Sequence, residues 1–120
     1  IETEGIERFR EFETKYLKKI LEETDVKIIA LGGGAWTIAE NREMIKLHNC
    51  TTVWLETTFE HCWRNITFSK QERPLAKDRE TVKKLFDERQ KFYCLADWHF
   101  IIQPQFTSYE TAKRIAEESF

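Results

Sequence analysis

Apolar and polar residues along the chain form blocks that are typical of helices and strands following one another. Apolar residues recur every three or four positions over residues 6–23, 40–48, 57–66, 78–91 and 109–118, which predicts helices. Short apolar runs rich in β-branched and aromatic residues predict buried strands at 26–31, 51–55 and 98–102. Because strands alternate with helices, the sequence predicts an α/β domain with a parallel sheet. Three strands are few for a parallel sheet whose two faces must both be covered, which indicates an incomplete chain.

Two of the predicted helices begin with capping signals. Thr57 and Glu60 form the pattern of a capping box, and Asp78 is a suitable N-cap for the next helix. Between these helices, residues 67–77 are polar and cationic around Pro74, which predicts a long loop.

Composition limits the class of protein. Of the 120 residues, 41% are hydrophobic, which is enough for a core and argues against disorder. With 19 basic and 21 acidic residues, the net charge of −2 argues against general binding to nucleic acid or to anionic membranes. The sequence has no long apolar run and no basic-then-apolar start, so we expect no membrane span and no secretory signal.

The three cysteines are far apart and do not form a C-x-x-C pair. Cys50, Cys62 and Cys94 therefore argue against a disulfide framework and against a zinc site. We expect free buried thiols in a reducing cytoplasm.

Three consecutive glycines follow the first predicted strand. Gly32, Gly33 and Gly34 carry no Cβ, so backbone there can approach a ligand closely, and ligands of open α/β sheets bind at the carboxyl ends of strands. A tight strand-to-helix turn is the alternative, although one glycine would usually suffice for it. The triplet is not a Walker A loop, because the sequence contains no Gly-Lys pair.

Charged residues interrupt the apolar stripes of two predicted helices. Arg10 and Glu13 lie on or beside the apolar face of the first helix, where they should either pair with each other or line a cleft. Arg89 occupies the next inward position after Val82, Leu85 and Phe86, where its planar fork would suit a carboxylate or phosphate. A helix-edge salt bridge and a snorkelling arginine are the alternatives.

The long loop carries a cluster of cations around Arg73-Pro74-Leu75. A mobile cationic loop between two helices would suit a lid over phosphates, whereas a solvated charged loop is the more frequent explanation. The cations are Lys70, Arg73, Lys77 and Arg79.

Taken together, these features resemble the shikimate kinase family. The likeness runs in the same order and spacing over essentially all 120 residues, and its motifs are specific in combination. They are Gly5 with Glu7-Arg8-Phe9-Arg10 and Glu13, Ile28 to Ala35, Glu40-Asn41-Arg42, Val53-Trp54-Leu55, Arg73-Pro74-Leu75, Glu88-Arg89, Tyr93 and Ala96-Asp97.

The resemblance implies a P-loop kinase-like fold with three α/β/α layers, and transfer of a phosphoryl group from ATP, with Mg²⁺, to the 3-hydroxyl of shikimate. It implies that Arg10 and Arg89 clamp the substrate carboxylate and that Glu13 orients them. It places Gly32, Gly33 and Gly34 against the sugar-like ring. It assigns Arg73 to a lid that stabilises the transferred charge.

The resemblance also implies a division of the chain. Residues 1–25 would bind substrate, 26–64 would form the core, 65–78 the lid and 79–120 the C-terminal part of one domain. Ile6, Lys91 and Ala76 depart from the family pattern in ways that look like tolerated variation.

Family members begin with a strand, a Walker A loop, a helix and a second strand, none of which matches this sequence. We therefore expect the C-terminal two thirds of a shikimate kinase, inactive alone, with most ligands for ATP and Mg²⁺ in the N-terminal segment. That segment or another copy would complete the sheet, and the complete protein would be a cytoplasmic monomer. There are two alternatives. One is a non-catalytic shikimate kinase-like binding module, and the other is a related P-loop kinase for another acidic substrate.

Overall fold

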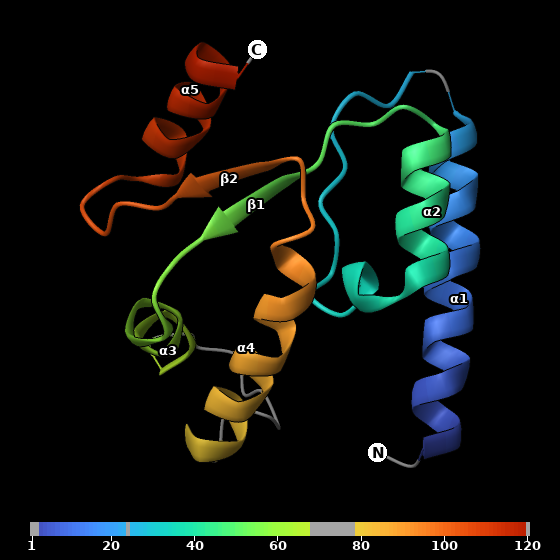
Figure 1. Cartoon of the computed structure of the whole chain (residues 1–120), viewed down its shortest axis with the longest axis horizontal. Helices are drawn as coiled ribbons and strands as arrows, with labels where there is room; N and C mark the ends of the chain where they lie inside the picture. The colour runs from blue at the N-terminus through green and yellow to red at the C-terminus, as the bar shows by residue number, and fades with distance from the viewer. Residues whose placement is uncertain (1–2, 24, 68–78, 120) are drawn as a thin grey trace. The chain divides into compact units, whose positions relative to one another are not determined.

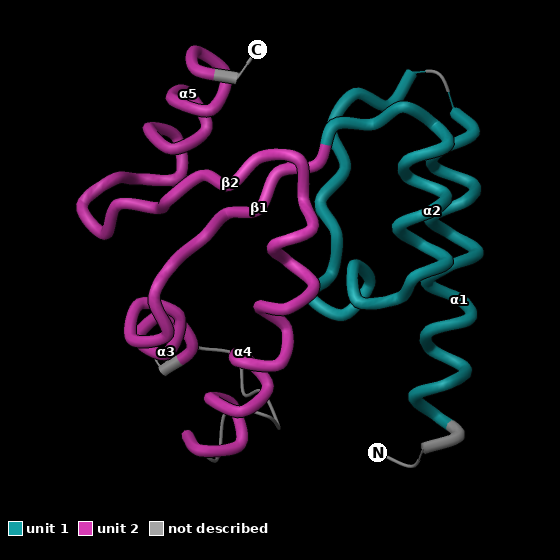
Figure 2. Tube along the Cα trace, in the orientation of Figure 1, with its two compact units in different colours: residues 1–51 teal, residues 52–120 magenta. Residues whose placement is uncertain are grey.

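The computed structural model describes residues 3–23, 25–67 and 79–119 (Figure 1). The chain divides into two compact units, residues 1–51 and residues 52–120 (Figure 2).

The first unit is a pair of helices with an extended connection. Helix α1 spans Thr3–Glu22 and helix α2 spans Ala39–Leu47, and a short 3-10 helix, η1, covers Ala35–Thr37 before α2. The two long helices lie side by side (Figure 1). Their core consists of buried Leu17, Leu21 and Ile45, against which Ile29, Trp36, Met44 and Cys50 pack.

The connection over residues 26–31 is not a β-strand, so the first strand predicted from the sequence is wrong in this structure. Ile29 packs on the core, but its neighbour Ile28 is 90% exposed. An apolar run becomes a strand only where a neighbouring strand pairs with its backbone N–H and C=O groups. Within the described part of the first unit no strand lies against it.

The second unit contains a two-stranded parallel sheet. Strand β1, Val53–Glu56, pairs with strand β2, Trp98–Ile101, in the register Val53 to Trp98. Helices α3, Phe59–Thr67, and α4, Arg79–Tyr93, come between the strands in sequence, as a parallel connection requires (Figure 1). Helix α5, Ser108–Ser119, follows β2. The second and third strands and all five helices predicted from the sequence are thus confirmed to within a few residues.

Three hydrogen bonds between the paired residues Thr52 and Asp97 fix the start of this sheet. The Thr52 backbone N–H donates to Asp97 Oδ2 at 2.9 Å, and the Thr52 hydroxyl donates to the same oxygen at 3.1 Å. The Asp97 N–H donates in turn to Thr52 Oγ1 at 2.8 Å. Because a slip of one residue would break all three bonds, this pair specifies the strand register.

Helix α3 begins one residue later than the predicted capping box requires. The hydroxyl of Thr58, not of Thr57, accepts from a helix N–H group, that of His61, at 3.2 Å. The Thr57 hydroxyl instead lies 3.0 Å from His61 Nδ1. The capping-box prediction is therefore wrong, and the N-cap predicted at Asp78 lies outside the described residues.

The three cysteines are free thiols, but they are not all buried as predicted. Cys50 and Cys62 are half-buried and Cys94 is exposed. Burial raises the pKa of the Cys62 thiol above its ordinary value, which keeps it protonated at neutral pH. Among the described helices, none is both long enough and apolar enough to cross a membrane.

Candidate functional site

The site in the first unit starts from an ion pair on α1. Arg10 Nη1 donates to Glu13 Oε1 at 2.7 Å, and the two side chains are 29% and 19% exposed. Residues three apart lie on the same helix face, and this face also carries buried Leu17. Of the two arrangements that the sequence left open, the pairing of Arg10 with Glu13 is confirmed.

The glycine triplet lies against this ion pair. An ideal Cβ atom built on Gly34 would lie 2.5 Å from Arg10 Cζ and 2.7 Å from Arg10 Nη1, well inside van der Waals contact. A Cβ on Gly32 would lie 3.1 Å from Glu13 Oε2. Gly34 is buried, whereas Gly32 and Gly33 are exposed. A side chain at residue 34 would displace the Arg10 guanidinium, and one at residue 32 would shift the Glu13 carboxylate slightly.

Side chains from η1 and α2 bind the turn that follows the glycines. Thr37 Oγ1 donates to the Gly34 carbonyl at 2.6 Å, and Asn41 Nδ2 donates to the Ala35 carbonyl at 2.9 Å. Arg42 Nη1 donates to the Trp36 carbonyl at 2.8 Å. From the sequence, Asn41 and Arg42 were noted only as part of the family likeness, without a role, and Thr37 was not noted. Asn41 could have been found as a polar residue in the buried stripe of α2, one turn before Ile45.

The chemistry of these side chains is compatible with binding of an anion. A guanidinium group has five N–H donors in a planar fork, and Glu13 engages Nη1 of Arg10. An arginine held by a carboxylate keeps its orientation, and the remaining donors can bind a carboxylate or a phosphate. The missing side chain of Gly34 leaves the space that the Arg10 guanidinium occupies.

Arg89 lies in the second unit, on α4, and is half-buried as predicted. Val82 of the same helix is buried and Phe86 contacts Phe59 with ring centroids 5.5 Å apart, so Arg89 continues the inward stripe. Within residues 3–23, 25–67 and 79–119, no carboxylate or other hydrogen-bond partner engages its guanidinium. A half-buried arginine whose guanidinium has no carboxylate partner is a suitable partner for an anion.

Of the four cations predicted in the lid, only Arg79 lies among the described residues. It forms an ion pair with Glu60 and lies over the ring of Phe59, with Cζ 4.9 Å from the centroid. These contacts join the start of α4 to α3, so Arg79 has a structural role here. Lys70, Arg73 and Lys77 lie outside the described residues.

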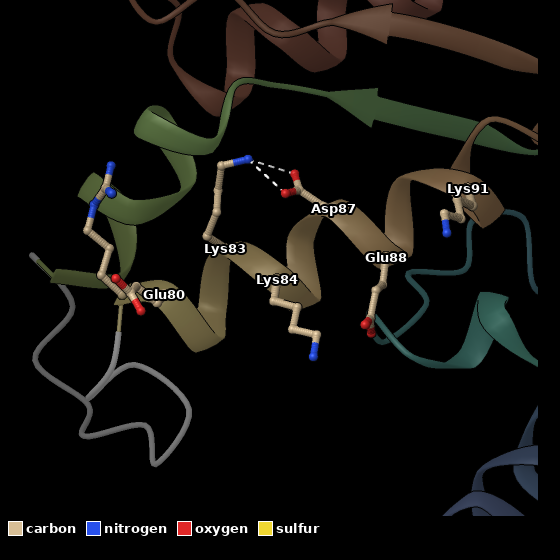
Figure 3. Close-up of a pocket in the computed structure, with 7 residues that line it drawn as sticks. Glu80, Lys83, Lys84, Asp87, Glu88 and Lys91 are labelled. Carbon is tan, nitrogen blue, oxygen red and sulfur yellow. Dashed lines mark hydrogen bonds and ion pairs between the residues drawn. The ribbon is translucent and has the colours of Figure 1, made fainter.

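A shallow hollow of about 360 Å³ follows the outer face of α4 (Figure 3). Charged side chains of both signs alternate along it, and Lys83 Nζ bonds both oxygens of Asp87, at 2.7 and 2.9 Å. Mixed charges on one helix face are typical of a solvated surface, so the hollow is not a candidate for the anion site. It is lined by Arg79, Glu80, Lys83, Lys84, Asp87, Glu88 and Lys91.

The described residues do not fit a bound metal ion or nucleotide phosphate. In the described ranges, no three His, Cys, Asp or Glu side chains are grouped so that they could hold a metal. The sequence also has no Gly-Lys pair to cradle phosphates.

Comparison with known proteins places this chain in a family. The family model for shikimate kinase matches residues 1–119. The shikimate kinase of Persephonella marina is 35% identical over 98 residues, which cover 78% of this chain and 56% of that protein. The shikimate kinase of Bacillus pumilus is 33% identical over 89 residues, covering 72% of this chain and 48% of that protein. The chain thus spans about half the length of these curated relatives.

A solved structure supports the fold. The crystal structure of shikimate kinase from Bacteroides thetaiotaomicron superposes with a TM-score of 0.73 at 24% identity, covering 91% of this chain and 64% of that one. This likeness confirms the expected α/β, P-loop kinase-like fold. With the family match over nearly its whole length, the chain belongs to the shikimate kinase family.

Proposed function

We propose that the complete protein that contains this chain transfers the γ-phosphoryl group of ATP to the 3-hydroxyl of shikimate. The observation that carries the proposal is the packing of Gly34 against the Arg10–Glu13 pair. It supports a site in which a guanidinium held by Glu13 lies against backbone that carries no side chain. A ligand that bears a carboxylate suits such a guanidinium.

In this proposal, Arg10 and Arg89 bind the shikimate carboxylate. Glu13 is the positioning residue, since its bond to Nη1 restricts the Arg10 guanidinium to one orientation. Gly32, Gly33 and Gly34 would lie against the ring of the substrate. The half-burial of both arginines favours the role, because a charge-assisted hydrogen bond is stronger where water is partly excluded.

The remaining roles rest on the family alone. ATP and Mg²⁺ are proposed as the phosphoryl donor and its metal ion, and Arg73 is proposed to close over the transferred group as a catalytic residue. We further propose that these 120 residues have no kinase activity alone, and that an additional strand completes the sheet, from the same protein or another copy. The proposed setting is a cytoplasmic monomer that binds neither nucleic acid nor membrane.

Substrate discrimination tests this function. A coupled assay of ADP release is run on the complete protein with shikimate and with methyl shikimate, the neutral ester. We expect turnover that depends on shikimate and is much weaker with the ester, because the ester removes the charge that the arginines bind. Shikimate binding without turnover would favour the non-catalytic module, and equal rates with acid and ester would contradict the carboxylate clamp.

A further inference from the structure

The turn after the glycine triplet is held by side chains at three consecutive carbonyl groups. Gly34 O, Ala35 O and Trp36 O each accept a hydrogen bond from a side chain, at 2.6, 2.9 and 2.8 Å. The donors are Thr37, Asn41 and Arg42, so two of the three come from the first turn of α2. Backbone bonds also close the turn, from Ala35 N–H to Gly32 O and from Thr37 N–H to Gly34 O.

Asn41 is costly at its position. Its side chain is fully buried at 0% exposure, and its Oδ1 atom has no hydrogen-bond partner among the described residues. A buried acceptor without a partner destabilises a fold, and an apolar side chain of the same size would avoid that penalty. The unpartnered Oδ1 offsets at least part of the stability that the other hydrogen bond of this side chain contributes. What the position does use is the Nδ2 donor, which binds the Ala35 carbonyl.

The bonded carbonyls determine where Gly34 lies. Each peptide unit is planar, so fixing a C=O direction fixes the whole unit. Glycine itself imposes little restriction on its backbone dihedrals, and a run of three would otherwise be the most adaptable part of the unit. Because Gly34 lies against the Arg10 guanidinium, the position of this turn also sets the space available to that group.

We propose that Asn41 and Arg42 are positioning residues for the anion site. Through the carbonyls of Ala35 and Trp36 they hold Gly34 against Arg10, and so keep the guanidinium aimed at the ligand carboxylate. The identity of that ligand rests on the proposed function. The restraint of the glycine turn by Asn41 and Arg42 is independent of that function.

The test uses the complete protein and the variant Asn41→Leu, with Glu43→Gln on the exposed face of α2 as the matched control. Calorimetric titration with shikimate should give a Kd about fivefold to tenfold higher for Asn41→Leu, the effect of losing about one hydrogen bond. The affinity for ATP and the melting temperature should not fall. Amide hydrogen exchange at Ala35 and Thr37 should become faster, since these N–H groups close the turn.

Arg42 provides a second pair of variants if Asn41→Leu does not fold. Arg42→Met removes the side-chain donor to the Trp36 carbonyl, whereas Arg42→Lys keeps a side-chain donor at this position. We expect weaker shikimate binding and faster amide exchange in Arg42→Met. In Arg42→Lys, we expect the affinity and the exchange rate to return toward those of the unaltered protein.

The results separate the two proposals. If the unaltered protein does not bind shikimate, the proposed function fails, and the exchange rates alone decide the restraint of the turn. If it binds shikimate, and the variants bind equally well with unchanged exchange, the positioning role is wrong. A fall in melting temperature without any change in Kd would also overturn it, because it would reduce Asn41 to a structural residue.

Discussion

Gly34 and Arg10 are in such close contact that an alanine at residue 34 would place its Cβ 2.5 Å from the guanidinium carbon. The two residues are 24 positions apart in sequence, and the contact joins the glycine turn to helix α1. The contacting atoms belong to the far end of a flexible side chain, so the arginine can move away. The contact therefore constrains the position of the guanidinium more than the stability of the fold.

Gly34→Ala should separate binding from stability. The backbone of Gly34 lies at φ −89° and ψ −17°, a conformation that alanine adopts without strain. We expect the melting temperature to change by no more than about 3 °C, while the Kd for shikimate rises roughly tenfold because Arg10 is displaced. Differential scanning calorimetry and titration of the complete protein measure the two effects.

Gly32→Ala is the graded comparison for that experiment. Its Cβ would lie 3.1 Å from Glu13 Oε2, so the carboxylate has to shift by only a few tenths of an ångström. We expect a smaller loss of affinity than for Gly34→Ala. Equal losses at both positions, or a large loss of stability at Gly34, would contradict this account of the turn.

Arg89→Ala should weaken shikimate binding and leave ATP binding nearly unchanged. A charge-assisted hydrogen bond to the carboxylate contributes about 1.5–3 kcal/mol, so the Kd for shikimate should rise roughly 10-fold to 150-fold. Lys84→Ala, an exposed cation on the same helix, is the control and should change neither affinity. An equal fall in the affinities for ATP and shikimate would rule out Arg89 as part of the substrate clamp.

Arg73→Ala should lower kcat far more than it raises the KM for shikimate. A lid residue acts after the substrate has bound, so it contributes mainly to the chemical step. Lys77→Ala serves as the comparison within the same loop. Small and equal effects of the two substitutions on kcat would mean that this loop is an ordinary charged connection.

The 120 residues alone should neither phosphorylate shikimate nor form a stable isolated monomer. Ile28 is 90% exposed in an apolar segment without strand pairing, and within the described residues β1 pairs on one side only. Such unpaired apolar segments associate or aggregate. Small-angle scattering and amide exchange on this chain would contradict the prediction if they gave a compact monomer with residues 26–31 and β1 strongly protected.

Local sequence patterns predicted most of the fold. All five helices follow from apolar periodicity, and β1 and β2 follow from runs such as Thr-Thr-Val-Trp-Leu. The run at residues 26–31 has the same composition but is not a strand. Composition favours a buried strand, whereas the pairing that makes one depends on a neighbour from elsewhere in the fold. Ile28, predicted in a buried strand, is exposed because no strand pairs with its segment.

The site was predictable only in part. Arg10 and Glu13 are three residues apart, so they lie on one face of the helix. The same spacing predicted that they either pair or line a cleft, and they pair. The contact between Gly34 and Arg10 depends on how the turn packs against α1, which no local spacing encodes. Asn41 belongs to the motif Glu40-Asn41-Arg42, but no role was predicted for it, because the sequence pattern does not identify the partner of its amide, the Ala35 carbonyl.

We propose above all that Arg10, oriented by Glu13 against the glycine turn, binds the substrate carboxylate. The most direct measurement is calorimetric titration of the complete protein and two of its variants with shikimate. We predict that Arg10→Ala raises the Kd roughly 10-fold to 150-fold, and that Arg8→Ala, an exposed arginine on the same helix, leaves it unchanged. Equal affinities for the unaltered protein and Arg10→Ala would contradict the claim.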